Sequence, residues 1–268
     1  MTLVPTDEQR SDLRSAAPGQ YVGGRTSALR RVLPLTGRPA FIVVLGVVFF
    51  YWLAQQSLDS IEKRSINQEQ ITQRFVEHLE LVAVSTVLVI LIAVPLGIAL
   101  TRPGARRISP IALGIANMGQ AIPSIGVLVL LAMAWGVGFR KAIIALVAYS
   151  LLPVLRNTMV GIRQVDPALI DAGRGMGLTK FQVLRMIELP IAVPIILAGI
   201  RVALILNVGT ATLAVFTNAG GLGAFINVGI ILNRTPVLLA GSVLAALLAL
   251  TIDWLAEIAE RVLRPRGL

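Results

Sequence analysis

The chain has no cysteine, one histidine and few charged residues, and each shortage excludes a class of function. Without cysteine in 268 residues it can have no disulfide framework, thiol nucleophile or thiolate metal site. A single histidine, His78, cannot build a histidine-based zinc site or a catalytic triad, so no metal site and no catalytic residue is predicted. Aromatic residues are 5% of the chain and scattered, which disfavours an aromatic cage for a quaternary amine.

Apolar residues dominate what remains. Charged residues make up 14% of the chain, against about a quarter in a soluble domain. Hydrophobic residues make up 56%, and the mean hydropathy is +0.80. The net charge of +10 does not indicate a nucleic-acid partner, because the basic residues lie between apolar runs rather than among aromatics on one face. The composition therefore predicts an integral membrane protein.

Six runs are apolar enough to cross a bilayer, which takes roughly 20 residues of helix. They span residues 39–56, 79–100, 110–135, 141–158, 190–213 and 236–256. The predicted fold is all-α, with six transmembrane helices. The run 110–135 is overlong and contains Pro123, so we expect a bent or broken helix there.

The distribution of lysine and arginine predicts the orientation. With the N-terminus inside, cytosolic segments carry 17 basic residues and outer segments carry 6. The positive-inside rule then places both termini in the cytoplasm. Residues 1–38 read as a disordered basic arm, either a mere tail or a contact for anionic membrane lipid. Residues 39–75 would form an extra helix and an outer polar segment, and residues 259–268 a cytosolic tail.

The stretch between the fourth and fifth runs, residues 165–190, is here called the elbow. Asp166 followed by Pro167 is typical of a helix start. Glycines at 173, 175 and 177 predict that this helix ends in a sharp turn.

A second short helix is predicted in the elbow. Thr179 and Gln182 have the spacing of a capping box at its start. Its apolar stripe would consist of Phe181, Leu184 and Ile187, and it would end at Leu189–Pro190. From pattern alone, the elbow is either an amphipathic loop on the bilayer surface or a rigid element that docks another protein.

The elbow also carries a recognisable motif. Asp171-Ala172-Gly173, Gly177, Ile187 and Leu189-Pro190 have the spacing of the E-A-A-x(3)-G-x(9)-I-x-L-P loop and resemble the permeases of ATP-binding-cassette (ABC) importers. Further motifs resemble the glycine betaine, carnitine and choline (osmoprotectant) permeases, and the likeness covers about residues 76–258. These motifs are His78-Leu79-Glu80-Leu81-Val82, Gln120-Ala121-Ile122-Pro123-Ser124, Pro153 with Arg156-Asn157-Thr158, and Asn218-Ala219-Gly220-Gly221-Leu222-Gly223.

The resemblance implies a type I importer core of five helices over residues 76–258. It implies a second permease subunit, identical or homologous, two cytosolic ATPase subunits and a separate extracytoplasmic solute-binding protein. A coupling loop within residues 161–190 would contact the ATPase through Asp171, Ala172, Gly173, Arg174, Gly177, Ile187, Leu189 and Pro190. The chain has no G-x(4)-G-K-[S/T] phosphate loop, so ATP and magnesium are expected on the partner, and no cofactor on this chain.

Seven residues are candidates for a translocation path or gate: Arg201, Asn207, Thr210, Thr212, Gly220, Gly221 and Gly223. Arg201 lies roughly 16 Å along the fifth helix from Pro190, where a charge is costly unless it faces a cavity or a partner. It either lines the path or binds carbonyls or carboxylates of a neighbouring helix. The asparagine and threonines line the path or bond across helices. The glycines form a re-entrant lip, as the resemblance suggests, or a plain loop.

Three polar residues near the ends of the runs have simpler interpretations. Asp253 is expected to reach the interface or pair with an arginine, and His78 and Glu80 to lie at an outer membrane edge.

The expected function is that of an importer permease for glycine betaine, choline, carnitine or proline, working by alternating access in the plasma (inner) membrane without covalent chemistry. One alternative is an ABC permease for another small solute, such as an amino acid. A weaker one is an ATP-independent secondary transporter, which would usually show intramembrane acids at the midplane.

Overall fold

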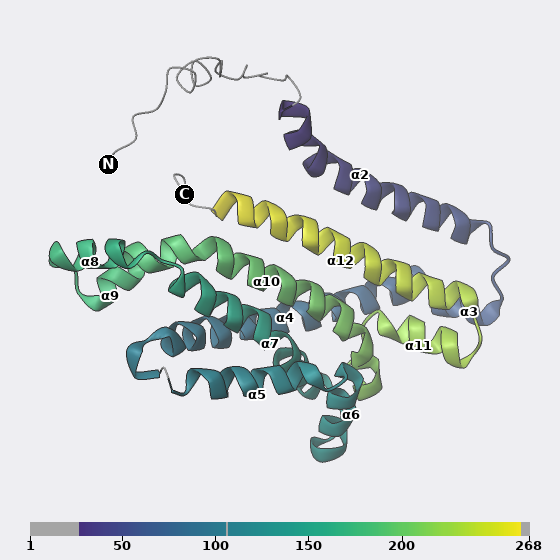
Figure 1. Cartoon of the computed structure of the whole chain (residues 1–268). Coiled ribbons are helices and arrows are strands. Elements are labelled where there is room, and N and C mark those ends of the chain that lie inside the picture. Colours follow the sequence, from purple (N-terminus) through teal and green to yellow (C-terminus); the bar gives the residue numbers. More distant parts are fainter. Residues whose placement is uncertain (1–26, 106, 264–268) are drawn as a thin grey trace, which may run out of the picture. The chain divides into compact units, whose positions relative to one another are not determined.

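The computed structural model describes residues 27–105 and 107–263, with side chains from residue 37 onward. Its described part consists of helices and connecting turns, shown in Figure 1. In chain order the elements are α2 (Ser27–Ala54), α3 (Ser60–Ser65), α4 (Gln68–Thr101), η1 (Pro103–Ala105), α5 (Ser109–Ala121), α6 (Ser124–Trp135), α7 (Phe139–Arg163), α8 (Pro167–Gly175), α9 (Lys180–Val183), η2 (Leu184–Glu188), α10 (Leu189–Ala211), η3 (Thr212–Thr217), α11 (Gly223–Ile231) and α12 (Thr235–Leu263).

The predicted all-α membrane architecture is confirmed. Five segments of the described chain are helical, long and apolar enough to cross a bilayer: Gly37–Ala54, Gln68–Thr101, Phe139–Arg163, Lys180–Thr217 and Thr235–Leu263. The pair α5 and α6 passes the same test together, although it is bent by 95°. Counting that pair as one span gives the predicted six.

The break between α5 and α6 lies where proline predicts it. Proline disfavours helical geometry in the residue before it, and Ile122 is accordingly extended, with φ −82° and ψ 133°. The next helix begins just after Pro123. Proline therefore divides an overlong apolar run into two helices of 13 and 12 residues.

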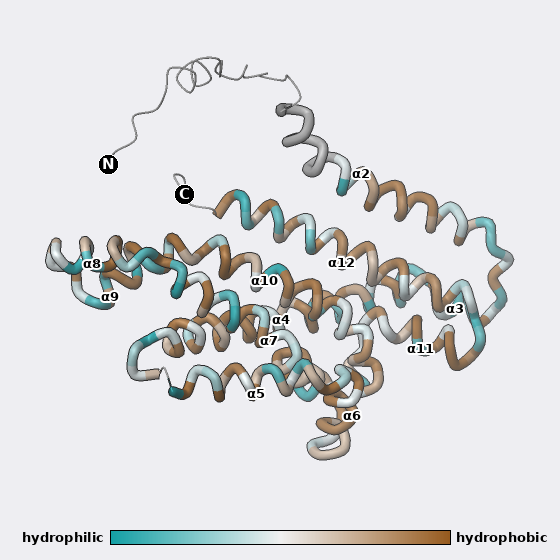
Figure 2. The backbone as a smooth tube through the Cα atoms, viewed as in Figure 1, coloured by the Kyte–Doolittle hydropathy of each residue, from teal (hydrophilic) through white to brown (hydrophobic). Residues whose placement is uncertain are grey.

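Contacts divide the chain into residues 1–40 and 41–268, and the packed helices from α4 onward belong to the second unit. In its centre α7 packs against α4 and α10, which also pack against each other, while α5 and α6 lie on α7 and α12 lies on α10 (Figure 1). In Figure 2 brown, apolar stretches of these helices alternate with white and teal ones.

Small residues let the central helices approach closely. A Cβ atom on Gly97 of α4 would lie 2.7 Å from the Cβ of Thr158 in α7, and one on Gly199 of α10 would lie 2.7 Å from the Cβ of Asn157. Burial of apolar area drives helix association weakly in lipid, so such close backbone contact supplies much of the cohesion.

The two ends of this core differ. At the elbow end, α8 and α9 project beyond the bundle (Figure 1). At the other end, here called the hairpin end, α11 packs along α12 as a helical hairpin. The nine residues of α11 are too few to cross a bilayer.

Three helices extend beyond the apolar runs that are predicted to cross the bilayer. The first long helix begins at Ser27 rather than at 39, because residues 27–33 are mostly good helix formers. The helix α4 begins at Gln68 rather than at 79, because the Asn67 side chain accepts a hydrogen bond from the Gln70 backbone and starts the helix in its polar segment. The last helix continues to Leu263. Residues 1–26 of the predicted arm and 264–268 of the predicted tail lie outside the described residues.

Candidate functional site

The first half of the elbow has the predicted form. The Asp166 side chain accepts a hydrogen bond of 2.8 Å from the Ala168 backbone, and Pro167 is the first residue of α8. The helix runs to Gly175, and Gly177 turns the chain with φ +88°. Glycine suits that position because other residues adopt a positive φ only at a cost.

The second half starts as predicted and then departs from the prediction. Thr179 and Gln182 form a reciprocal capping box, with bonds of 2.8 Å from the Thr179 backbone and 3.3 Å from the Gln182 backbone. However, α9 leads through the π-helical turn η2 directly into α10, so the predicted end at Leu189–Pro190 is wrong. The wide turn precedes Pro190, whose ring would clash in a regular helix interior.

Gly173 is a packing residue inside α8 rather than its terminator. It is buried, and a Cβ atom there would lie 2.6 Å from the Cδ1 of Ile187. The predicted glycine-rich turn therefore reduces to Gly177. Two motif residues, Gly173 and Ile187, meet across the elbow and hold α8 against η2.

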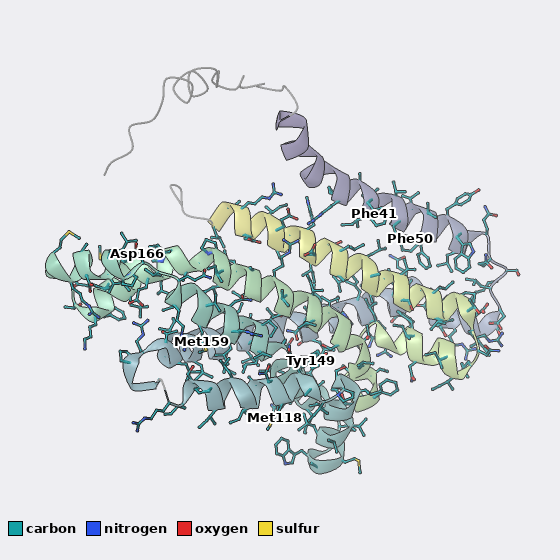
Figure 3. All side chains as sticks on the ribbon, viewed as in Figure 1. Phe41, Phe50, Met118, Tyr149, Met159 and Asp166 are labelled. Carbon is teal, nitrogen blue, oxygen red and sulfur yellow. The ribbon has the colours of Figure 1, made fainter. Side chains whose placement is uncertain are left out.

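The predicted apolar stripe on the second helix is also wrong in one position. Val183 is 1% exposed and packs inside the elbow, whereas Phe181 is 69% exposed. Met176 and Met186 are exposed as well. The acidic Asp171 and the basic Arg174 lie on the exposed surface of α8. In Figure 3 the elbow side chains near Asp166 project away from the bundle. The elbow thus offers apolar and charged groups to a partner.

One ion pair ties the elbow to the helix core. Arg102 follows the last residue of α4, and Glu188 ends η2. Their side chains form a two-pronged contact, Nη2 to Oε2 at 2.5 Å and Nη1 to Oε1 at 3.3 Å. Glu188 is buried, so the pair fixes the base of the elbow to the end of α4.

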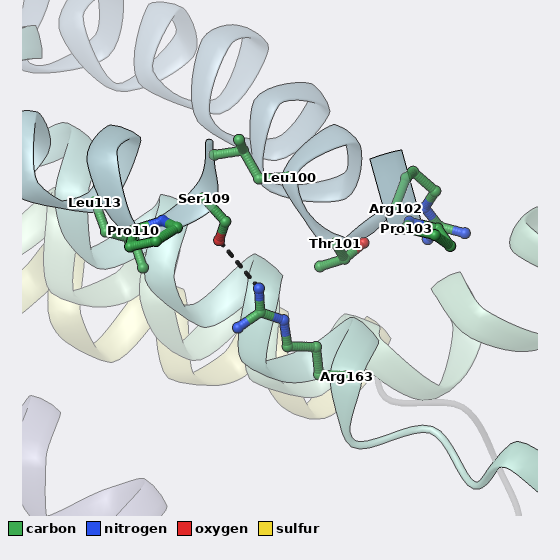
Figure 4. Close-up of a pocket in the computed structure, with 8 residues that line it drawn as sticks. All are labelled: Leu100, Thr101, Arg102, Pro103, Ser109, Pro110, Leu113 and Arg163. Carbon is green, nitrogen blue, oxygen red and sulfur yellow. Dashed lines mark hydrogen bonds between the residues drawn. The ribbon is translucent and has the colours of Figure 1, made fainter. Parts of the chain in front are cut away.

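An open hollow of about 720 Å³ lies beside this pair. Leu100–Pro103, Ser109, Pro110, Leu113 and Arg163 line it (Figure 4). Arg163 at the end of α7 donates a hydrogen bond of 3.0 Å to the Ser109 hydroxyl at the start of α5. The hollow therefore lies where the ends of α4, α5 and α7 converge.

Arg201 binds carboxylates on α12. Its guanidinium contacts Asp253 at 2.6 Å, Glu257 at 3.5 Å and Glu260 at 3.7 Å. This arrangement is the one expected of an arginine that binds carboxylates of a neighbouring helix. Asp253 pairs with an arginine, which is one of the two positions predicted for it.

Asn207, Thr210 and Thr212 do not share one surface. The buried Asn207 side chain donates a 2.9 Å hydrogen bond to the Thr86 hydroxyl on α4. Thr210 lines a small cavity with Ser124 and Tyr149, and its hydroxyl bonds to the Leu206 carbonyl. Thr212 borders a separate cavity of about 230 Å³ between α6, η3 and α11. A role of these residues in translocation stays a prediction.

The glycines at 220 and 221 lie against α4. Both have positive φ, +77° and +85°, in the turn formed by residues 218–222. The Glu77 carboxylate accepts a hydrogen bond of 2.9 Å from the Gly221 backbone, and Leu222 donates one of 3.3 Å to the Nδ1 of His78. Gly223 starts α11, so close to η3 that a Cβ would overlap the Thr212 carbonyl.

The expected position of His78 at an outer membrane edge stays a prediction, and its side chain is fully buried within the protein. Its Nε2 lies 3.1 Å from the Val208 carbonyl of α10. The structure thus joins two motifs, around residues 78 and 220, that are far apart in sequence.

Comparison with known sequences decides the family. The profile described as "Binding-protein-dependent transport system inner membrane component" matches residues 93–266. The chain belongs to this family. As a member it is a multi-pass component of the inner membrane and a subunit of a transport system.

Relatives of this inner membrane component are permeases. The choline transport system permease protein OpuBB of Bacillus subtilis is 41% identical over 204 residues, 75% of this chain and 92% of that protein. The osmoprotectant import permease protein OsmY of Salmonella typhimurium is 39% identical over 240 residues, 90% of this chain and 98% of that protein.

Solved structures agree with the predicted type I fold. A chain of the MetNI methionine ABC transporter in inward-facing form is similar at TM-score 0.66 and 25% identity, over 73% of this chain and 96% of that one. An amino acid ABC transporter is similar at TM-score 0.62 over 77% of this chain and all of that one; at 19% identity this likeness concerns the fold alone.

Proposed function

We propose that the chain is the permease subunit of an ATP-driven importer of osmoprotectants, the class that includes glycine betaine, choline, carnitine and proline. The names of relatives about 40% identical over three quarters of the chain or more support this solute class. The chain would span the membrane and move solute by alternating access, while a separate subunit hydrolyses ATP.

The elbow carries the proposal. Both its short helices begin at side-chain caps, and the second continues without a break into α10. A rigid element continuous with a membrane-spanning helix can transmit a displacement that a loose loop could not. We infer that the exposed apolar and basic groups of the elbow, among them Met176, Phe181 and Arg174, dock in a groove of the ATPase.

The remaining partners follow from this assignment. Two ATPase subunits would hold ATP and magnesium, so this chain itself needs no cofactor. A second permease, identical or homologous, would complete the pathway, and a separate solute-binding protein would deliver solute from outside. The elbow end and both termini would face the cytoplasm, which the excess of 17 basic residues over 6 supports.

Within the chain, Thr212 is the better candidate for the solute path, because it borders a cavity of about 230 Å³. The cavity beside Thr210, about 10 Å³, has room for no more than a water molecule. Arg201 and Asn207 are bound to α12 and α4 respectively, which supports a role in holding helices together. Gly220, Gly221 and Gly223 would shape the hairpin end, where solute enters.

The test is purification of the tagged chain in mild detergent, followed by identification of what comes with it. An ATPase with a phosphate loop should copurify, and the exposed substitution Asp171→Ala should weaken its retention. The complex in liposomes should take up glycine betaine or choline only when ATP is supplied on the side that carries the ATPase subunits. Uptake of an amino acid other than proline instead would favour an ABC importer of another substrate class. Uptake by the chain alone without ATP would refute the proposal in favour of a secondary transporter.

A further inference from the structure

At the hairpin end, two side chains of α4 bind the backbone of segments far along the chain. Glu77 and His78 are neighbours on α4, and between them they bind three backbone groups of two other segments. The groups are the Val208 carbonyl of α10 and the N–H groups of Gly221 and Leu222. One short stretch of α4 thus binds both the end of α10 and the turn that leads into α11.

The protonation of the His78 ring follows from its partners. The Leu222 N–H can only donate, so Nδ1 accepts that bond and carries no proton. The proton is then on Nε2, which donates to the Val208 carbonyl. Each ring nitrogen has one backbone partner of the correct kind, and the ring is fully buried between them.

The Val208 carbonyl is available because the helix tightens there. Thr212, at the start of η3, donates its backbone N–H to Gly209, three residues back, instead of to Val208. A helix end leaves carbonyls that need partners. His78 supplies one, so its bond depends on α10 changing into η3 at this position.

The glycines of the turn fit the same interaction. A Cβ atom on Gly220 would lie 2.2 Å from the Glu77 carboxylate, and one on Gly221 would lie 3.1 Å from Nδ1 of His78. The turn is also held from its other side, where Gly138 between α6 and α7 donates a bond of 2.6 Å to the Thr217 carbonyl. Ala219, in the middle of the turn, is 9% exposed.

We propose that His78, with Glu77, is a positioning residue that latches the turn 218–222 against α4 and α10, and that release of this latch opens the hairpin end during transport. The inference rests on the proposed importer function. The connecting element is α10, which starts at the elbow and reaches Val208 about 30 Å further along. A displacement of α10 relative to α4, transmitted from the elbow, therefore moves the carbonyl to which His78 is bonded.

The test uses the absence of cysteine in the chain. A single reporter, Ala219→Cys, is reconstituted with its ATPase partner in liposomes and labelled with a membrane-impermeant maleimide. The latch predicts slow labelling without nucleotide and roughly tenfold faster labelling when ATP and vanadate trap the complex. Adding His78→Phe, which removes both bonds at similar size, should give the fast rate without nucleotide.

Two further variants separate positioning from mere stability. His78→Gln can donate to Val208 and accept from Leu222, so it should restore slow labelling and the ratio of solute imported to ATP hydrolysed. Glu80→Gln, an exposed neighbour, is the control and should change neither. If His78→Phe fails to assemble, Glu77→Ala should raise the labelling rate partway, because it removes the Gly221 bond and leaves both His78 bonds in place. It also removes the contacts of Glu77 with Gln73 and Arg74 within α4, so Arg74→Ala is measured beside it.

Equal labelling of the reporter with and without trapped nucleotide would overturn the latch, as would unchanged protection in His78→Phe and Glu77→Ala. Failure of the importer proposal would be recognised by a different result: no ATPase would copurify with the reporter chain. The comparison of His78→Phe with its parent in nucleotide-free liposomes still tests the latch in that case.

Discussion

Glu188, in the wide turn before α10, and Arg102, just past the end of α4, bind each other through two pairs of atoms, the shorter at 2.5 Å. This contact joins the elbow to a residue 86 positions earlier in the chain, at the end of α4. Any partner that moves the elbow must either move α4 with it or break this pair.

Removal of one member of this pair should weaken the chain and its coupling. Arg102→Ala leaves the Glu188 carboxylate buried without its cation, and we expect the free energy of unfolding to fall by about 1–3 kcal/mol. The fall should lie below that of a fully buried pair because Arg102 is partly exposed. Thermal unfolding in detergent measures it. Arg102→Lys keeps the charge but not the two-pronged geometry, so its melting temperature should lie between those of the wild type and Arg102→Ala. A wild-type melting temperature in Arg102→Ala would contradict the role given to the pair.

The turn at Gly177 should be sensitive to substitution where its neighbour is not. Gly177→Val places a β-branched residue at φ +88°, at a cost of at least about 1–2 kcal/mol. The membrane core should still insert and fold, while solute uptake per ATP hydrolysed falls. Gly175→Ala is the matched control, because Gly175 is helical with nothing within 4 Å of an added Cβ. It should be neutral or slightly stabilising. Normal uptake by Gly177→Val would refute the role of the rigid elbow.

Substitution of two apolar residues of the elbow, two positions apart, should affect two different properties, partner binding and stability. Phe181→Ala removes an exposed ring, so the stability of the isolated chain should stay within about 0.5 kcal/mol while retention of the ATPase drops. Val183→Ala removes methyl groups from a buried site and should lower stability by about 1–2 kcal/mol. Melting curves and copurification yields, measured on both variants, distinguish docking from packing. Unchanged ATPase retention in Phe181→Ala would place the docking surface elsewhere.

Local features of this fold could be predicted from the sequence because their causes are local. Pro123 disfavours helix in the residue before it, and the break occurs there. Asp166 and Thr179 each accept a bond from a backbone group within three residues, so capping spacing alone reveals them. The apolar runs likewise follow from the length of a bilayer-spanning helix.

The features that escaped prediction depend on contacts across the fold. The sequence does not reveal the burial of the His78 ring, because its partners lie 130 and 144 positions away. Gly173 looks like a helix terminator until Ile187 packs on it. The π-helical turn before Pro190 has no signal in the apolar period, and the same period does not distinguish exposed Phe181 from buried Val183.

Arg201 offers the last prediction, which concerns charge within the membrane. Its guanidinium contacts three carboxylates of α12, and its removal would leave them facing α10 without that cation. Arg201→Leu should therefore lower the yield and stability of the folded chain, by about 1–3 kcal/mol, because three carboxylates lose the cation that they share, and charge at membrane depth is costly. Asp253→Asn should cost less, since Glu257 and Glu260 still contact the arginine. Melting temperatures of both variants, with Arg201→Lys as the charge-preserving control, decide the matter. If Arg201→Leu folds like wild type but loses uptake, then the arginine acts on the solute path and not as a bond between α10 and α12.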